Sequence, residues 1–231
     1  MRENQTMWIK ICANTNLADA QLADALGADA LGFVFAPSKR RVTAQQVAAI
    51  VPHLPTSIET IAVVQSRDAD EIIDLIRTTG LTGVQLHGGL DLPLARTLHE
   101  AFAGRIALIQ TLHWHVGEDA QSAADLEAQL QAIAAEPALT RVLIDAKVGH
   151  ALGGTGHTFD WAAAKRALAS ASGKLDLIVA GGLRPENVAE AIQTLAPWGV
   201  DVASGVESEP GRKDPGKLKQ FLENARPRRD V

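Results

Sequence analysis

The chain has 231 residues, 46% of them hydrophobic, and a formal net charge of −5 at pH 7. This charge argues against a nucleic-acid partner, which would require a basic face, and no run approaches the roughly 18 apolar residues of a membrane span. Cys12 is the only cysteine, so no internal disulfide can form, and we expect a cytoplasmic protein.

Short β-branched runs alternate with longer stretches in which alanine and leucine recur at helical spacing. The expected strands are Trp8–Cys12, Ala30–Phe35, Ile58–Val64, Gly83–Leu86, Ile106–Gln110, Arg141–Ile144, Leu175–Val179 and Val200–Val202. The expected helices are Leu17–Leu26, Ala44–Val51, Ala69–Thr79, Leu92–Phe102, Ala120–Ala135, Trp161–Ser170, Glu186–Leu195 and Pro215–Asn224. Such alternation builds a parallel sheet, and eight pairs in this length favour a closed barrel. We therefore predict an α/β fold, one (β/α)8 TIM barrel over residues 1–231, with flexible tails at 1–6 and 226–231.

Two glycine turns follow the last two expected strands, where the active site of such a barrel is built. Gly181-Gly182 comes after the seventh strand, and Ser204-Gly205 after the eighth. Glycine lets backbone N–H groups approach a ligand closely, and Pro185 suits the first turn of a helix whose positive end faces the loop. Tight turns alone would explain either pair. Both together predict a cradle for the phosphate of a small-molecule substrate.

Two reactive side chains also end strands. Cys12 follows the first strand and is either a buried small hydrophobe or a thiolate base. Asp145 follows the sixth and is either an acid/base group or the ion-pair partner of Lys147. The catalytic interpretation of Asp145 is favoured because the glycine-rich segment 153–156 comes soon after and could fold over the barrel mouth.

Cations and histidines complete the expected mouth. Lys39, Arg40 and Arg41 follow the second strand, and arginine binds a carboxylate through a bidentate fork. His87 ends the fourth strand and could line the pocket. No set of histidines has zinc-ligand spacing backed by acidic partners, so no metal site is expected.

Together these segments resemble phosphoribosylanthranilate isomerase, an enzyme family of tryptophan biosynthesis. The resemblance runs in chain order from Ile9 to about Phe221. Its motifs are Lys10-Ile11-Cys12 with Thr15-Asn16, Gly32-Phe33-Val34-Phe35 with Ser38-Lys39-Arg40, Val84-Gln85-Leu86-His87-Gly88, Asp145-Ala146-Lys147, Gly153-Gly154-Thr155-Gly156, Thr158-Phe159-Asp160-Trp161, Ala180-Gly181-Gly182-Leu183 with Pro185-Glu186-Asn187-Val188, Val200-Asp201-Val202 with Ser204-Gly205-Val206-Glu207, and Pro210-Gly211-Arg212-Lys213-Asp214.

The resemblance implies an Amadori rearrangement of N-(5-phosphoribosyl)anthranilate to 1-(2-carboxyphenylamino)-1-deoxyribulose 5-phosphate. It implies that Asp145 is the acid, that Cys12 is the base, and that no metal or organic cofactor takes part, because an iminium serves as the electron sink. The anthranilate carboxylate would meet Arg40 or Arg41, of which we choose Arg40. The remaining substrate-binding residues would be Gln85, His87, Gly154, Thr155 and Gly156. The expected binding partner is this phosphorylated substrate, and we expect no nucleic-acid or membrane partner. We expect the protein to be a monomer or a homodimer.

The chain departs from the family pattern in two places. Ala13 stands where the family usually has glycine; if that position needs φ > 0, alanine costs about 1 kcal/mol or more. Val64-Gln65-Ser66 replaces the usual end of the third strand. Two alternative functions stay open. One is a related sugar-phosphate isomerase of histidine biosynthesis, which carries aspartate where this chain has Cys12; the other is a non-catalytic phosphosugar-binding barrel.

Overall fold

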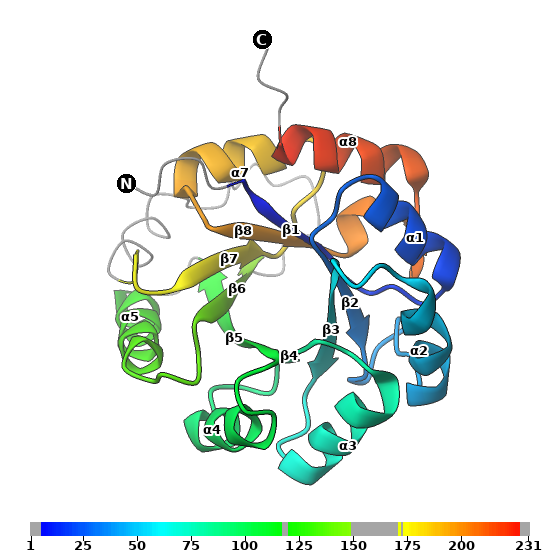
Figure 1. Cartoon of the computed structure of the whole chain (residues 1–231). Coiled ribbons are helices and arrows are strands. Elements are labelled where there is room, and N and C mark those ends of the chain that lie inside the picture. The colour runs from blue at the N-terminus through cyan, green and yellow to red at the C-terminus, as the bar shows by residue number, and fades with distance from the viewer. Residues whose placement is uncertain (1–5, 117–119, 149–170, 172, 227–231) are drawn as a thin grey trace.

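A computed structural model describes residues 6–116, 120–148, 171 and 173–226. Eight parallel strands close into a barrel in the order β1 to β8, with helices around the outside (Figure 1). The strands are β1 (Trp8–Ile11), β2 (Ala30–Val34), β3 (Glu59–Val64), β4 (Gly83–Leu86), β5 (Ala107–Val116), β6 (Arg141–Val148), β7 (Asp176–Ala180) and β8 (Gly199–Val202). The predicted (β/α)8 barrel is therefore confirmed.

The described helices are α1 (Leu17–Ala25), α2 (Ala44–Ile50), α3 (Ala69–Thr79), α4 (Leu92–Ala101), α5 (Ala120–Ala134), α7 (Val188–Leu195) and α8 (Pro215–Ala225). Short polar side chains set where several of them begin, because such groups accept the unpaired N–H groups of a first turn. Asn16 caps α1, Asp214 caps α8, and Thr43 forms a reciprocal capping box with Gln46 at α2. No described helix combines the length and apolar character that crossing a membrane requires.

Alternation along the strands divides the core into two layers. Outward residues such as Ile9 and Ile11 pack in the large cluster between barrel and helices, whereas Trp8 and Ile178 belong to a smaller inner cluster. At the N-terminal end of the barrel, Trp8 stacks on Trp198 with ring centroids 5.0 Å apart. Arg141 lies over both rings, 4.9–5.5 Å from their centroids. This packing fills one end of the barrel and leaves the cavity at the other.

Two strands, β5 and β6, continue past their predicted ends through segments that include polar residues. The predicted fifth and sixth strands end at Gln110 and Ile144, but β5 and β6 run to Val116 and Val148 and stay paired along that length. Helix α7 begins at Val188 rather than Glu186, so Pro185 precedes the helix instead of lying in its first turn. The predicted helix Trp161–Ser170 lies outside the described residues.

Two features near the C-terminus were not predicted. A short 3-10 helix, η2 (Ser204–Val206), leads into an antiparallel hairpin of β9 (Glu207–Glu209) and β10 (Arg212–Lys213) before α8. Arg226, which we assigned to the flexible tail, donates from Nε to the carbonyl of Met7 at 2.7 Å and from Nη1 to that of Gly27 at 2.7 Å. The C-terminal helix is therefore tied to the start of the barrel through Arg226.

Candidate active site

A cavity of about 390 Å³ opens at the C-terminal ends of the strands. The residues predicted for the site that line it are Cys12, Arg40, Gln85, His87, Asp145, Gly181, Gly182 and Ser204. Gly205 is not among the lining residues, and Gly154, Thr155 and Gly156 lie outside the described residues. The C-terminal mouth of the barrel therefore brings together eight predicted residues that are spread over most of the sequence.

Cys12 lies directly beyond β1, with its thiol near two buried ammonium groups. Lys10 is fully buried, and its Nζ lies 2.8 Å from Oδ1 of Asp201 on β8. Burial raises the pKa of the Cys12 thiol, and attraction to Lys10 and Lys213 offsets part of that rise. Burial alone would lower the pKa of Lys10, but Asp201 and Cys12 outweigh it, so Lys10 keeps its charge beside the thiol.

The backbone turns sharply directly after Cys12. Ala13 has φ of 62° and is only 1% exposed, so this position does need the left-handed conformation that glycine adopts without strain. Space for the thiol comes from Gly32 on β2, where a Cβ would lie 2.7 Å from Sγ of Cys12 and 3.0 Å from Cε of Lys10. The two small residues therefore shape the pocket around Cys12.

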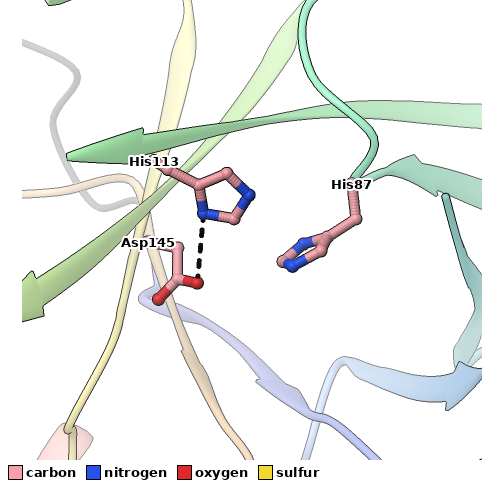
Figure 2. Close-up of side chains that lie close together, drawn as sticks. All are labelled: His87, His113 and Asp145. Carbon is pink, nitrogen blue, oxygen red and sulfur yellow. Dashed lines mark ion pairs between the residues drawn. The ribbon is translucent and has the colours of Figure 1, made fainter. Parts of the chain in front are cut away.

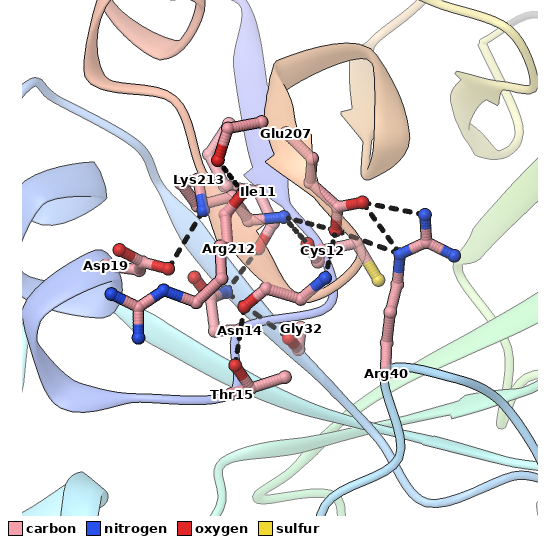
Figure 3. Close-up of polar contacts among 12 residues, drawn as sticks. Ile11, Cys12, Asn14, Thr15, Asp19, Gly32, Arg40, Glu207, Arg212 and Lys213 are labelled. Atoms are coloured by element: carbon pink, nitrogen blue, oxygen red, sulfur yellow. Dashed lines mark hydrogen bonds and ion pairs between the residues drawn. The ribbon is translucent and has the colours of Figure 1, made fainter.

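Arg40 reaches the same pocket and is held by Glu207 (Figure 3). Its Nε donates to both carboxylate oxygens at 2.9 Å, and its Nη2 donates to Oε2 at 2.7 Å. Glu207 raises the pKa of Arg40. Burial opposes the charge of Glu207, yet Arg40 and Lys213 together hold its pKa below the ordinary value. Arg41 lines a different, smaller pocket, so of the two candidate arginines only Arg40 faces this cavity.

Lys213 connects this ion pair to Cys12. Its buried Nζ donates to the carbonyl of Cys12 at 2.5 Å and lies 3.4 Å from Oε1 of Glu207. Burial lowers the pKa of Lys213. The β9–β10 hairpin, which carries Lys213, thus fixes the backbone of Cys12 from outside the barrel. No sequence pattern predicts this contact, because it joins residues about 200 positions apart.

The two glycine turns pack against each other at the ends of β7 and β8. Gly181 and Gly182 have φ of 93° and 65°, a conformation that favours glycine. A Cβ on Gly205 would lie 1.9 Å from the carbonyl oxygen of Leu183, whereas one on Gly182 would meet no atom within 4 Å. Gly205 thus permits the close packing, and Gly182 keeps the cavity side open.

Asn187 fixes the first of these turns. Its Oδ1 accepts a hydrogen bond from the backbone N–H of Arg184 at 2.8 Å, and its Nδ2 donates to the carbonyl of Gly182 at 3.1 Å.

Inside the barrel, Nε2 of Gln85 donates to Oγ1 of Thr111 at 3.0 Å. This contact with Thr111 on the neighbouring strand β5 orients the Gln85 side chain, which lines the cavity.

Asp145 faces two histidines across adjacent strands (Figure 2). His113 on β5 is its direct register partner, and Nδ1 of His113 lies 3.4 Å from Oδ2 of Asp145. The ring of His87 meets that of His113 edge-on, with centroids 4.6 Å apart. The sequence analysis missed His113, because the predicted strand ended three residues before it.

A family model for N-(5'phosphoribosyl)anthranilate (PRA) isomerase matches residues 9–224. The N-(5'-phosphoribosyl)anthranilate isomerase of Geobacter sulfurreducens is 40% identical over 229 residues, covering 94% of this chain and 98% of that protein. The crystal structure of phosphoribosyl anthranilate isomerase from Thermotoga maritima has a TM-score of 0.79 at 35% identity, covering 95% and 98% of the two chains. A structure of a phosphoribosyl anthranilate isomerase in complex with reduced 1-(o-carboxyphenylamino)-1-deoxyribulose 5-phosphate has a TM-score of 0.77 at 32% identity, with the same coverage.

Proposed function

Because the chain belongs to the N-(5'-phosphoribosyl)anthranilate isomerase family, we propose that its cavity performs the Amadori rearrangement of N-(5-phosphoribosyl)anthranilate in tryptophan biosynthesis. The product is 1-(2-carboxyphenylamino)-1-deoxyribulose 5-phosphate. The observation that carries the proposal is one cavity lined by a thiol, a carboxylate, an arginine and the glycine turns after β7 and β8.

The phosphate would bind at Gly181, Gly182, Ser204 and Gly205. Backbone N–H groups of such turns suit an anion, and the open space beside Gly182 gives it room. Strands β7 and β8 stand between β6, which carries Asp145, and β1, which leads to Cys12. A phosphate held there places the ribose between the acid and the base.

Asp145 would act first, as the general acid. It delivers a proton to the ring oxygen of the ribose, the bond from that oxygen to C1′ breaks, and the nitrogen lone pair forms an iminium. Asp145 is 21% exposed in its side chain, so it borders the cavity and can regain a proton from solvent. General acid catalysis of this kind is worth roughly 10²–10⁴ in rate.

Cys12 would act second, as the general base. Its thiolate removes the proton from C2′, and the electron pair moves into the iminium to give an enolamine that tautomerises to the ketone. The thiolate is the required form, and the charges of Lys10 and Lys213 are the groups that favour it. The iminium itself accepts the electrons, so these two side chains account for the proton transfers.

Arg40 would hold the anthranilate carboxylate. Guanidinium has five donors, and Nε and Nη2 are the nitrogens that face Glu207, while Nη1 points away from it (Figure 3). Gln85 and His87, which line the same cavity, would contact the rest of the substrate.

The test uses Cys12→Ala and Asp145→Asn, with Asp74→Asn on the exposed face of α3 as a control carboxylate. Turnover is followed by the loss of anthranilate-type fluorescence from freshly generated substrate. We expect each active-site variant to lose about 10²–10⁴ in kcat, with product affinity nearly unchanged and the control fully active. Unchanged turnover in Cys12→Ala would exclude Cys12 as the base.

We also propose that the protein is cytoplasmic and is a monomer or a homodimer. Family membership supports a role in a biosynthetic pathway. Light scattering coupled to size-exclusion chromatography distinguishes the two assemblies by mass, and a higher oligomer would contradict both.

A further inference from the structure

His87, His113 and Asp145 form the one group among the described residues in which three metal-ligand side chains converge. One ligand atom from each residue lies within 4.8 Å of the other two. The rings and the carboxylate point toward a shared space (Figure 2); His87 follows β4, whereas His113 and Asp145 lie within the C-terminal halves of β5 and β6. We propose that these three residues form a binding site for a divalent transition-metal ion of the zinc type, and that the bound ion inhibits the enzyme.

The geometry needs little change to accept zinc. Ligand atoms around tetrahedral zinc, with bonds of about 2.0–2.2 Å, lie roughly 3.3–3.5 Å apart. Nδ1 of His113 and Oδ2 of Asp145 are already 3.4 Å apart. All three ligand atoms lie within 4.8 Å of one another, so an inward shift of the His87 ring by about 1.5 Å or less completes the set.

The donor chemistry selects the class of ion. Two imidazole nitrogens and one carboxylate oxygen suit zinc, cobalt, nickel or copper, whereas magnesium and calcium prefer all-oxygen sets. Three protein ligands leave a position for water, as in open zinc sites. Ions can enter, because the side chains of His113 and Asp145 are 28% and 21% exposed.

Rigid strand pairing holds the ligands near each other. His113 and Asp145 are register partners on β5 and β6. His87 directly follows β4, and its backbone N–H donates to the carbonyl of Val64 at 2.8 Å. A site on paired strands keeps ligand positions more closely than one on free loops. The sequence analysis placed His87 and Asp145 at the barrel mouth but not His113, because the predicted fifth strand ended at Gln110 and β5 continues past it.

We expect inhibition because the proposed metal ligand Asp145 is also the proposed general acid. This step rests on the proposed function. The positive charge of a metal bound to Oδ2 of Asp145 opposes protonation of either carboxylate oxygen. Asp145 then cannot protonate the ribose ring oxygen, and the ion also fills space on one side of the cavity. Removing the metal restores the proton and the activity.

The experiment is calorimetric titration of zinc chloride into the untagged, chelator-treated full-length protein. We expect one zinc ion per chain. His113→Asn and Asp145→Asn should each weaken zinc binding at least about tenfold, since even residues outside the ligand shell are worth 10–100-fold in metal affinity. His53→Asn, an exposed histidine in the short helix after α2, is the matched control and should bind zinc as the unaltered protein does.

A second measurement does not depend on the folding of any variant. Cobalt added to the unaltered protein should give the visible absorption of a low-symmetry nitrogen–oxygen site, and zinc should displace it. Absence of saturable binding, or equal affinity in the two ligand variants and the control, overturns the site.

Inhibition is tested separately from binding. Isomerase turnover should fall as zinc saturates the site, recover with chelator, and need at least about tenfold more zinc in His113→Asn, each variant being compared with its own metal-free rate. Zinc that binds without slowing turnover overturns the inhibition. If the protein binds zinc as expected but has no isomerase activity, the proposed function fails and the metal site stands.

Discussion

Gly205→Ala is the sharpest test of how the two glycine turns are built. A Cβ at this position would lie 1.9 Å from the carbonyl oxygen of Leu183 and 2.9 Å from its carbonyl carbon. An ordinary C···O contact is about 3.3 Å, so the turns must separate by roughly 1.4 Å. Overpacking costs about 1–3 kcal/mol, and we expect the upper end because both obstructing atoms are backbone. For a chain of this length, about 3 kcal/mol lowers Tm by roughly 6–12 °C.

Gly182→Ala separates the clash from simple backbone strain. Its Cβ would meet no atom within 4 Å, but φ is +65°, which costs roughly 1–2 kcal/mol in an L-residue. Calorimetric melting should therefore rank Gly205→Ala as the less stable variant. Turnover should also fall about 100-fold in Gly205→Ala, since a displacement near 1 Å has that effect on a positioned substrate. A Gly205→Ala protein that melts with or above Gly182→Ala would refute the packing argument.

Three further predictions concern the charges around Cys12. Lys10→Met should cost about 3–5 kcal/mol of unfolding free energy by leaving Asp201 buried without its partner, measured by urea denaturation, and a loss below 1 kcal/mol would contradict it. Because burial raises the pKa of the Cys12 thiol, the thiolate, followed by its ultraviolet absorbance in the protein without substrate, should form only above the ordinary thiol pKa of about 8.5; a thiolate already complete at neutral pH would contradict this. Arg40→Lys should raise KM about 10–100-fold with little change in kcat, because a charged hydrogen bond worth roughly 1.5–3 kcal/mol is lost in ground and transition states alike; an unchanged KM would remove Arg40 from carboxylate binding.

The barrel and most of its mouth could be predicted because they depend on short-range patterns. Strand–helix alternation predicts the fold, and residues that end parallel strands must meet at one end of it. That rule is sufficient to bring Cys12, Asp145 and the turns at Gly181 and Ser204 to one cavity. It required no knowledge of which side chains touch.

What was not predicted depends on pairing and on long-range contacts. The β5 strand continues through His113, where β6 pairs with it residue by residue. Polar and apolar residues alternate from Thr111 to Val116, so this extension had a strand signal that the prediction did not use. The ion pair of Glu207 with Arg40 and the hydrogen bond from Lys213 to the carbonyl of Cys12 each join residues more than 160 positions apart. The β9–β10 hairpin that supplies both is too short to show periodicity.

Ala13 shows how a residue that violates a local rule can be tolerated at an active site. Its φ of 62° costs an alanine roughly 1–2 kcal/mol. The residue is 1% exposed, and burying its methyl group returns about 0.8 kcal/mol. Alanine also has less conformational entropy than glycine in the unfolded chain, which stabilises the folded state by about 0.4–1 kcal/mol. Burial and the unfolded-state effect therefore offset part of the backbone strain, so the chain can keep alanine beside Cys12 at a modest cost in stability.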